Sequence, residues 1–411
     1  MKPLTVMVVA GDPSGDLAAA ELVSALRSRT GPVPPRFIGA GGPAMAAAGV
    51  DLQFELTRHS VIGLEILSRL RWFRHVFRDL LQTAQSEVPD VILGVDYAGF
   101  NLRFASAVHT HVRRRQGPFS NWSPKIVQFV SPQVWASRPG RARQMARTHD
   151  LVLCILPFEP EWYSREAPGL RAQFVGHPVV DRHVSSPPPL EREDPKPVGS
   201  TLVLLPGSRP GELRRHLPVM LPAGREVARA TGVHLQLVLP REDLRPLAGT
   251  LCHGFPEVSI QVGGLNDALR QATVALASTG TVTLECAWYG VPTVTLYKTS
   301  RLTFEIGRRI ITVPHLAMPN LLAGGPLLPE FVQHTATAPA MAAALLDLLR
   351  NPERRLAIRT GLLRVARSLG PPGAPARAAD AILSLLQTPR HNTLGGTLEN
   401  RAGTTLGRGG D

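Results

Sequence analysis

The stretch "LTVMVVAGDPSGDL" (4–17) places a turn rich in glycine and acidic residues directly after an apolar run. Residues 4–10 predict a buried strand, and the pattern from Leu17 to Arg27 predicts a helix. This order often builds a phosphate site in α/β proteins, because free backbone N–H groups at the helix N-terminus face the ligand. Asp12 and Asp16 would repel a phosphate, so we expect this turn to bind a different group.

The same alternation of apolar runs and helical patterns continues along the chain and occurs twice. It predicts two doubly wound (Rossmann-like) α/β domains, 1–184 and 201–387, with ligands in the cleft at the carboxyl ends of their strands. The segment 185–200 is rich in proline and charge and is predicted to be a linker. Residues 388–411 lack apolar content and are predicted to be disordered. The expected strands are 4–10, 36–39, 90–95, 125–130, 151–155 and 173–175, then 201–205, 234–239, 258–262, 273–277 and 292–297.

The composition limits the class of protein. A chain of 411 residues with 44% hydrophobic and 19% charged residues is long enough for two or three globular domains. No apolar run reaches the roughly 20 residues that span a bilayer, and we predict a cytoplasmic protein. The three cysteines show neither the spacing of a metal site nor that of a disulfide framework.

The formal charge of +13 is carried mostly by arginine, since lysine occurs only four times. This bias fits the base composition of a GC-rich genome, and it also fits contact with an anionic membrane surface. The sequence has no zinc-finger spacing, RNP aromatics or basic zipper, so nucleic acid is not an expected partner.

The segment "GLEILSRLRWFRHVFRDLLQTA" (63–84) predicts an amphipathic helix. One interpretation is a helix that packs on the core and keeps a solvated basic side. The other is a helix that lies in the headgroup region of a membrane with its apolar side down. The apolar stripe consists of Ile66, Leu67, Leu70, Phe73, Phe77, Leu80 and Leu81, and the basic side of Arg69, Arg71, Arg74, His75 and Arg78.

Two turns in the second half of the chain have phosphate-binding character. In "LLPGSRPGEL" (204–213), Arg209 follows a glycine-serine turn and offers a bidentate fork for a pyrophosphate, although it also fits an ordinary surface arginine. In "ASTGTVTLE" (277–285), hydroxyl and glycine residues precede a helix whose Glu285 suits two ribose hydroxyls, or merely complements the helix dipole. The small residues of this second turn are Ser278, Thr279, Gly280 and Thr281.

Taken in order, these stretches resemble the lipid A disaccharide synthases, inverting glycosyltransferases of the two-domain type B fold. The similarity runs from residue 4 to about residue 385, which is nearly the whole chain. It is carried by "AGDPSGD" (10–16), "FIGAGGPAM" (37–45), "VIGLEIL" (61–67), "ILGVDYAGFNLR" (92–103), "FVSPQVWASRPGR" (129–141), "DLVLCILPFEPEWY" (150–163), "FVGHPVVD" (174–181), "LLPGSRPGEL" (204–213), "STGTVTLE" (278–285) and "MPNLLAGGPLLPEFVQ" (318–333).

The resemblance implies a reaction and its partners. The family condenses UDP-2,3-diacylglucosamine with 2,3-diacylglucosamine 1-phosphate (lipid X), forming the β-1,6-linked lipid A disaccharide 1-phosphate and UDP, without a metal or other cofactor. It implies a protein that is peripheral on the inner face of the cytoplasmic membrane. The oligomeric state stays open, with a homodimer among the alternatives.

The resemblance also implies roles for particular residues. Arg209, Glu285, Asn320 and Gln333 are expected to bind UDP. Ser14 and Asp16 are expected to face the cleft and to bond sugar hydroxyls or amides, which would explain the acidic turn of the opening stretch.

The chain departs from the family pattern where a catalytic base is expected. The family reads Gly-Ile-Asp-Ala-Pro-Asp-Phe-Asn where this chain has "GVDYAGFN" (94–101), so Gly99 replaces the proposed base. An inverting transfer to a hydroxyl needs a base within hydrogen-bond reach. The candidates are Asp96, another cleft acid such as Asp12 or Asp16, or none. The alternatives are therefore a related UDP-sugar transferase with a different acceptor, and a non-catalytic nucleotide-sugar or lipid-binding protein.

Overall fold

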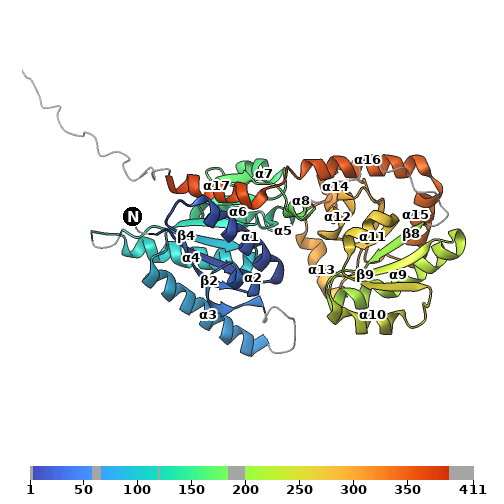
Figure 1. Cartoon of the computed structure of the whole chain (residues 1–411), viewed down its shortest axis with the longest axis horizontal. Coiled ribbons are helices and arrows are strands. Elements are labelled where there is room, and N and C mark those ends of the chain that lie inside the picture. Colours follow the sequence, from blue (N-terminus) through green and yellow to red (C-terminus); the bar gives the residue numbers. More distant parts are fainter. Residues whose placement is uncertain (1–2, 58–65, 119–120, 184–199, 388–411) are drawn as a thin grey trace, which may run out of the picture.

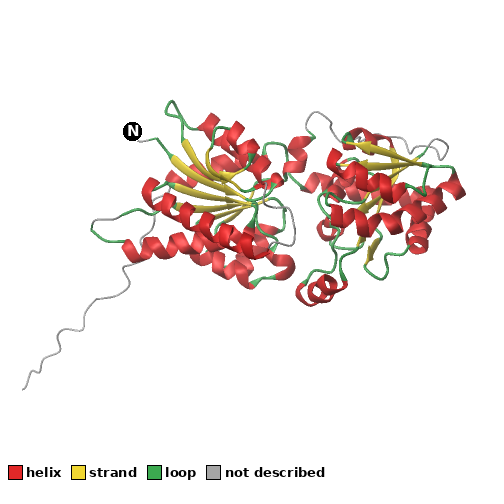
Figure 2. Cartoon of the chain, turned by 90° about the horizontal axis from the view of Figure 1, so that it is seen from below, coloured by secondary structure: helices red, strands yellow, loops and turns green. Residues whose placement is uncertain are grey.

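The computed structural model shows two α/β lobes side by side (Figure 1). It describes residues 3–57, 66–118, 121–183 and 200–387. The predicted linker up to residue 199 and the predicted tail 388–411 lie outside the described residues. Helices flank both faces of each sheet (Figure 2), which confirms the predicted pair of doubly wound domains.

The first sheet has seven strands in the order β3-β2-β1-β4-β5-β6-β7, and every neighbouring pair is parallel. Val6 and Val8 face one layer of helices and Met7 and Val9 face the other, so β1 is buried on both sides. The strands are β1 Thr5–Ala10, β2 Arg36–Gly41, β3 Asp51–Glu55, β4 Val91–Val95, β5 Lys125–Phe129, β6 Leu151–Cys154 and β7 Ala172–Phe174.

The second sheet repeats this arrangement with six parallel strands in the order β10-β9-β8-β11-β12-β13. In both sheets the first strand of the domain is the third from one edge, and the chain winds outward from it to each edge. The strands are β8 Thr201–Leu205, β9 His234–Leu239, β10 Val258–Val262, β11 Ala272–Ser278, β12 Thr293–Tyr297 and β13 Glu330–Val332. The short edge strands β3 and β13 were not among the expected strands, since each has few residues and no buried apolar run.

The last helix, α17 (Ala374–Gln387), does not belong to the second domain as the sequence predicted. It packs on α1 (Pro13–Arg29) of the first domain, and its Ala378 and Ile382 join the core of the first sheet. Arg29 also pairs with Asp380 at 2.7 Å. The expected boundary of 201–387 is therefore wrong for this helix, because its apolar stripe completes the core on the far side of the cleft.

The helix α3 (Ile66–Glu87) packs along the first sheet beside α4 (Ala98–Arg115). Phe77 makes edge-on contacts with Phe100 and Phe104, at 5.4 and 5.8 Å between ring centroids. The core interpretation therefore holds for the part of the helix that follows residue 70. The side chains of 66–70 lie outside the described residues.

The remaining helices connect the strands or cover the sheets. No helix in the described part of the chain is long and apolar enough to cross a bilayer. These helices are α2 Pro43–Ala47, α5 Val134–Ser137, α6 Gly140–Thr148, α7 Glu159–Glu166, α8 Pro178–Arg182, α9 Pro210–Thr231, α10 Arg245–Cys252, α11 Leu265–Gln271, α12 Val282–Trp288, α13 Arg301–Ile310, α14 Met318–Ala323, α15 Ala338–Arg350 and α16 Pro352–Ser368.

Candidate active site

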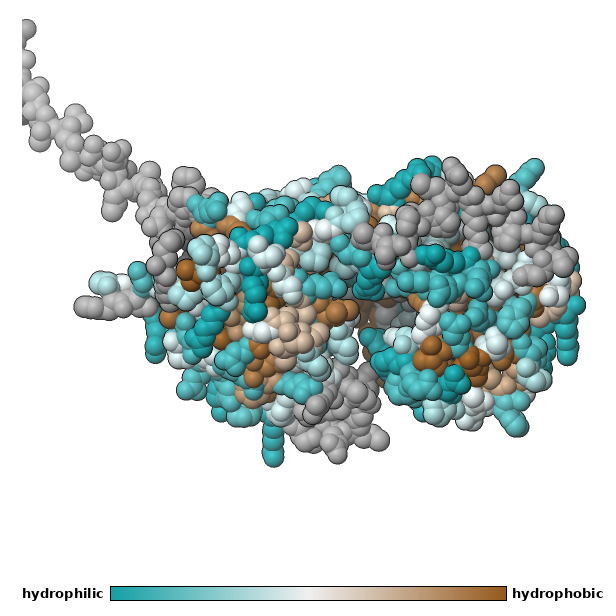
Figure 3. Space-filling model, in the orientation of Figure 1, coloured by the Kyte–Doolittle hydropathy of each residue, from teal (hydrophilic) through white to brown (hydrophobic). Residues whose placement is uncertain are grey.

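A cavity of about 380 Å³ lies between the two domains and is lined by both. Ser14 and Asp96 line it from the first domain, and Thr281 and Met318 line it from the second. Figure 3 shows the notch between the two lobes. The cavity therefore brings together Ser14 and Asp96, which the sequence predicted at the cleft, and Thr281 of the predicted phosphate-binding turn.

The first-domain side of this cavity is the switch point of the sheet. β1 and β4 are neighbours, but α1 packs on one face of the sheet and α4 on the other. The turns after the two strands thus part in opposite directions and leave a crevice at their carboxyl ends, where ligands bind in folds of this type. Asp12 follows β1 and Asp96 follows β4.

Asp96 is presented to the cleft by an unusual backbone turn. Asp96 and Tyr97 both have positive φ angles, 49° and 40°, which side chains other than glycine rarely adopt. The amide groups of Asn101 and Gln128 each donate a 3.0 Å hydrogen bond to the Asp96 carbonyl oxygen and fix this turn. This strained turn places Asp96 at the wall of the cleft cavity.

Asp12 and Ser14 form a linked pair at the start of α1. The Asp12 carboxylate accepts hydrogen bonds from the Gly15 N–H at 2.7 Å and from the Ser14 hydroxyl at 2.8 Å. Asp12 is thus the N-cap of α1, a position that favours aspartate. The Ser14 hydroxyl is exposed and keeps acceptor capacity toward the cavity.

The two carboxylates interact electrostatically. Loss of solvent around the Asp96 carboxyl group raises its pKa, and the negative charge of Asp12 raises it further. A hydrogen bond from the Tyr97 backbone lowers it. A raised pKa makes Asp96 a stronger proton acceptor than an ordinary surface aspartate. Asp96 is the better base candidate of the two, because the Asp12 carboxylate is already bonded to the Gly15 N–H and the Ser14 hydroxyl.

Asp16 has a structural position. It is 4% exposed, and its carboxylate accepts hydrogen bonds of 2.8 to 3.0 Å from the N–H groups of Gly42, Ala44 and Met45. These donors are the free N–H groups at the start of α2, so Asp16 caps that helix from a neighbouring element. The expectation that Asp16 faces the cleft as a base or sugar ligand does not fit this placement.

Gly99 lies in open space at the start of α4. A Cβ atom built on it meets no heavy atom within 4 Å, and the residue is exposed. An aspartate would therefore fit at this position, and it would also complement the helix N-terminus. Steric crowding therefore does not explain why this chain has Gly99 where the family has an aspartate.

Arg209 occupies the N-cap of α9 in the second domain. The backbone N–H groups of Ser208 and Arg209 both donate to the Glu212 carboxylate, at 2.8 and 3.1 Å. The Arg209 side chain is 75% exposed and lies 3.7 Å from Glu212. Its guanidinium is therefore available to an anionic ligand, while the helix N-terminus is already occupied by a carboxylate of the chain.

The turn 278–281 lies beside the Arg209 turn, because β11 and β8 are paired and Ala277 stands opposite Leu205. Ser278 is 4% exposed at the end of β11, and the Thr279 N–H donates to the Leu296 carbonyl at 3.0 Å. Gly280 has a φ of 140°, open space around it and a backbone that a ligand can approach. Thr281 is exposed toward the cleft cavity.

Glu285 lies one turn further along α12 and forms an ion pair with Arg182, at 3.5 Å. Burial raises the pKa of Glu285, and the Arg182 charge lowers it in part. Arg182 ends α8, whose Val179 and Val180 pack against the core of the second domain, and it also lines the cleft cavity. It carried no assigned role in the sequence analysis, although it directly follows the matching stretch "FVGHPVVD" (174–181).

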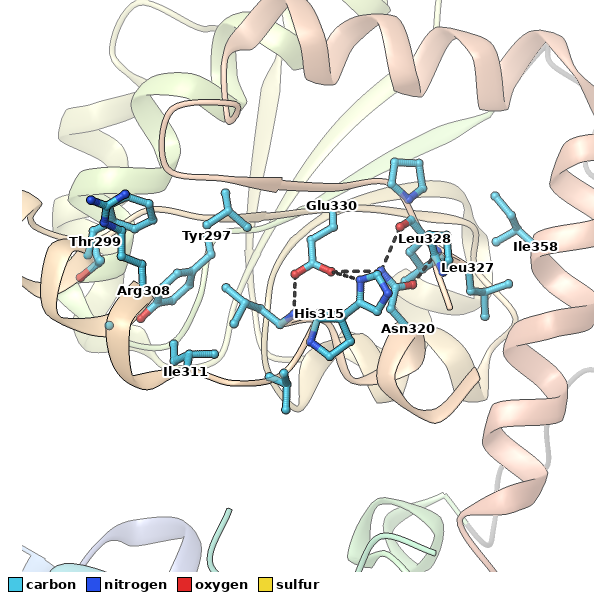
Figure 4. Close-up of a pocket in the computed structure, with 18 of the residues that line it drawn as sticks. Tyr297, Thr299, Arg308, Ile311, His315, Asn320, Leu327, Leu328, Glu330 and Ile358 are labelled. Carbon is cyan, nitrogen blue, oxygen red and sulfur yellow. Dashed lines mark hydrogen bonds and ion pairs between the residues drawn. The ribbon is translucent and has the colours of Figure 1, made fainter. Parts of the chain in front are cut away.

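Asn320 and Gln333 are held in structural contacts. Asn320 is fully buried, and its amide bonds the Leu328 backbone in both directions and the Glu330 carboxylate (Figure 4). The Gln333 amide accepts from the Thr299 N–H and donates to the Thr299 carbonyl, at 3.0 and 3.2 Å. Their expected role as direct UDP ligands does not fit these contacts, which instead position the segments around the end of β12.

A second residue that sequence reasoning missed is Glu159, which lines the same cavity but is 1% exposed. It accepts hydrogen bonds from the Trp135 indole and from the N–H groups of Ile155 and Leu156, each at 3.0 to 3.1 Å. Burial raises the pKa of Glu159 to about 7, against these bonds, which lower it. With three donors around it, Glu159 supports the cleft wall and is not in reach of a substrate proton.

Known proteins resemble this chain over nearly its whole length. A family model described as lipid-A-disaccharide synthetase matches residues 6–368. A lipid-A-disaccharide synthase from Syntrophus aciditrophicus is 37% identical over 405 residues, covering 94% of this chain and 99% of the relative. One from Rhodopseudomonas palustris is 38% identical, covering 93% of this chain and 95% of the relative.

Solved structures at low identity share the fold. A protein from Listeria monocytogenes, described as a putative UDP-N-acetylglucosamine 2-epimerase, has a TM-score of 0.59 at 15% identity, covering 94% of this chain and 96% of its own. The MurG protein of Acinetobacter baumannii has a TM-score of 0.56 at 14% identity, covering 93% of this chain and 100% of its own. These similarities extend over both domains and support the type B arrangement.

Proposed function

Because the chain belongs to the lipid-A-disaccharide synthetase family, we propose that it transfers a 2,3-diacylglucosaminyl group from UDP to 2,3-diacylglucosamine 1-phosphate. It is a glycosyltransferase, and the family uses a UDP-sugar and lipid substrates. The observation that carries the assignment to this cleft is that Asp96 of one domain and Thr281 of the other line the same cavity.

The reaction needs a base on the acceptor side. The acceptor's 6-hydroxyl oxygen forms a bond to the anomeric carbon of the donor sugar, and the bond from that carbon to the diphosphate breaks on the opposite face. The hydroxyl proton passes to the Asp96 carboxylate, whose raised pKa suits it to accept a proton. Ser14 and Asp12 lie beside Asp96 and would bond the sugar hydroxyls of the acceptor.

The reaction also needs a cation at the leaving group. As the bond to the diphosphate breaks, negative charge builds up on its oxygens, and the exposed Arg209 guanidinium would stabilise that charge. The backbone of Gly280 and the hydroxyl of Thr281 would approach the same phosphates from the neighbouring turn. Glu285 would accept hydrogen bonds from the ribose, held in place by Arg182.

Two other readings make different predictions in one assay. The purified protein is mixed with UDP-2,3-diacylglucosamine alone and with donor plus acceptor, and UDP and disaccharide are measured. We expect UDP and disaccharide to appear together and only with acceptor. UDP release with a different acylated sugar but not this one would indicate a transferase with another acceptor. UDP-sugar binding without release would indicate a non-catalytic relative.

We also propose that the protein contacts the anionic inner surface of the cytoplasmic membrane through α3. Arg71, Arg74 and Arg78 are exposed on this helix, and each basic side chain near such a surface contributes about 1 kcal/mol. Replacing all three with glutamine should release the protein from phosphatidylglycerol vesicles at moderate salt, measured by co-sedimentation. Replacing Arg113, Arg114 and Arg115, the exposed basic end of α4, is the matched control. Equal sedimentation of the α3 variant and the parent would refute this surface.

A further inference from the structure

A cavity of about 880 Å³ lies within the second domain and is larger than the cavity of the cleft. Its walls come from the end of β12, from α13, from the segment 311–316, from β13 and from α16 (Figure 4). This volume lies near the upper end of the roughly 300–1,000 Å³ typical of small-molecule sites. The proposed reaction assigns it no role.

The lining is chiefly apolar, and the charged side chains in it have partners. Phe304, Ile311, Val313, Leu327 and Ile358 contribute apolar surface. Arg308 pairs with Glu305 at 2.8 Å, and Arg354 pairs with Asp347. The ligand that such walls suit is a hydrocarbon, because its burial needs no hydrogen bonds.

The polar cluster at one end of the cavity is also internally satisfied. The Glu330 carboxylate accepts from the Leu316 and Ala317 N–H groups at 2.6 and 3.2 Å and from the Asn320 amide at 3.1 Å. His315 lies 3.6 Å from the same carboxylate (Figure 4). These bonds hold the segment 313–320 in place as a wall and leave the carboxylate well supplied with donors.

The position of the cavity assigns it to the donor side. Its lining residues all lie between Tyr297 and Ile358, in the domain that carries Arg209 and Glu285. Tyr297 ends β12, the strand paired with β11, whose end opens into the turn 278–281. A sugar bonded to a diphosphate at that turn would lie one strand away from Tyr297 and Thr299.

The same wall continues apolar space toward the first domain. Val313, Pro314 and Asn320 line both this cavity and a smaller one of about 280 Å³, whose other wall is Trp135 and Trp162 of the first domain. The Thr312 N–H donates to the Ala136 carbonyl at 2.9 Å and joins the two domains here. A chain in the large cavity would therefore have apolar neighbours along its path to the cleft.

Helix α13, which forms one wall of the cavity, also has apolar side chains on its solvent-exposed side. Thr303, Phe304 and Gly307 of α13 line the cavity, while Leu302 and Ile306 of the same helix are 72% and 50% exposed. An exposed apolar side flanked by Arg301 and Arg309 is typical of a helix at a membrane surface. A hydrocarbon ligand taken from a bilayer would thus meet apolar side chains before it enters the cavity.

We propose that this cavity holds an acyl chain of the donor, and that its volume sets which donor chain lengths are used. The proposal rests on the proposed function for the identity of the substrate. The cavity is assigned to the donor and not to the acceptor, because Ser14 and Asp96, which are proposed to face the acceptor, lie in the other domain and do not line it. The apolar lining and the paired charges select hydrocarbon over a second sugar or phosphate group.

Gly307 offers a direct test, because it lies in the middle of the cavity-facing strip of α13. A Cβ atom on it meets only Ile311, at 3.8 Å, and its φ is not positive. Gly307→Trp would therefore fill the cavity from its roof. Gly249→Trp is the matched control, since Gly249 is exposed in α10 of the same domain and has no heavy atom within 4 Å of a built Cβ.

The activity arm compares donors with butanoyl and tetradecanoyl chains, and then acceptors with the same two chains. In Gly307→Trp, the ratio of kcat/KM for the long-chain to the short-chain donor should fall at least about tenfold, since loss of two buried methylenes already gives such a factor. Gly249→Trp should keep the parent's ratio. An equal loss for both donors, or a shift in acceptor preference instead, would overturn the proposal.

A binding arm is independent of the reaction. Parinaric acid, a fluorescent fatty acid, should bind the parent and Gly249→Trp and should bind Gly307→Trp at least about tenfold more weakly. Equal binding by all three would overturn the cavity assignment. If the parent forms no disaccharide from any donor yet parinaric acid binding responds as expected, the proposed function fails and the hydrocarbon site stands. If Gly307→Trp does not fold, as judged by circular dichroism, Thr303→Trp fills the same cavity from an exposed position.

Discussion

The turns after β1 and β8 occupy the same place in their two domains but differ in charge. Both follow the first strand of their domain, which lies inside the sheet, and precede a long helix, α1 in one domain and α9 in the other. In both, a carboxylate of the chain accepts N–H groups at the helix start, Asp12 in the first and Glu212 in the second. The helix N-terminus therefore does not distinguish the two sites.

The two turns differ in the residue at the helix N-cap. In the first domain the cap is Asp12 itself, and with Asp96 it makes the crevice acidic. In the second domain the cap is Arg209, whose exposed guanidinium makes the turn suitable for a diphosphate. Under the proposed function, the turn of the first domain would serve a base and sugar hydroxyls, and the turn of the second domain would serve the leaving group.

The largest expected effect tests the acidic side. Asp96→Asn keeps the shape of the side chain and removes the proton acceptor, so turnover should fall by about 10²–10⁴. UDP affinity should hardly change, because Arg209 and Glu285 lie in the other domain. Steady-state kinetics and UDP titration measure the two quantities, with the exposed Asp51→Asn as control.

Several outcomes would change this comparison. If Asp96→Asn unfolds the protein, the carboxylate is structural, and if turnover survives, Asp12 becomes the next candidate base. Gly99→Asp in the Asp96→Asn background restores the family pattern in open space. Recovery of turnover in the double variant would show that either position serves the same hydroxyl.

The next effect tests the basic side. Arg209→Ala should weaken UDP binding by about 1.5–3 kcal/mol, the usual contribution of a hydrogen bond to a charged group. Titration calorimetry measures this, and Arg229→Ala at the far end of α9 should bind UDP like the parent. An unchanged affinity in Arg209→Ala would remove the charge difference between the two turns as an explanation of their roles.

A third variant separates a structural acid from the cleft acids. Asp16→Ala leaves three N–H groups at the start of α2 without their acceptor, and a buried donor left unsatisfied costs about 1–3 kcal/mol. We expect a lower free energy of unfolding in urea and little change in UDP affinity. Unchanged stability together with lost turnover would indicate that Asp16 takes part in the reaction.

The smallest effect is a change in pH dependence. If Asp96 is the base, it acts when ionised, so kcat/KM should rise with pH through its raised pKa. Asp12→Asn removes a negative charge that contributes to this shift, so the pKa of Asp96 should fall and the acidic limb of the profile should move to lower pH. Asparagine keeps the N-cap hydrogen bonds. An acidic limb that stays in place would show that Asp12 and Asp96 do not interact as the comparison requires.

The sequence by itself determined the two α/β domains and the turns that follow the first strand of each domain. Apolar strand runs with turn residues after them are local features, and the order of strand, turn and helix fixes which residues stand at the carboxyl ends of the strands. Asp12, Ser14, Asp96, Arg209 and Thr281 are placed there by chain order alone, so their positions after these strands could be predicted without a structure.

Only the tertiary structure decided which polar residues are already committed to the fold. Asp16, Asn320 and Gln333 have the right type and the right neighbourhood, but their partners lie 8 to 34 positions away in the chain. The same holds for α17, whose apolar stripe gives no sign of which domain it covers, and for Arg182, which meets Glu285 across 103 positions. A sequence pattern records which groups can make hydrogen bonds, and only packing decides whether those bonds are made within the protein or left for a ligand.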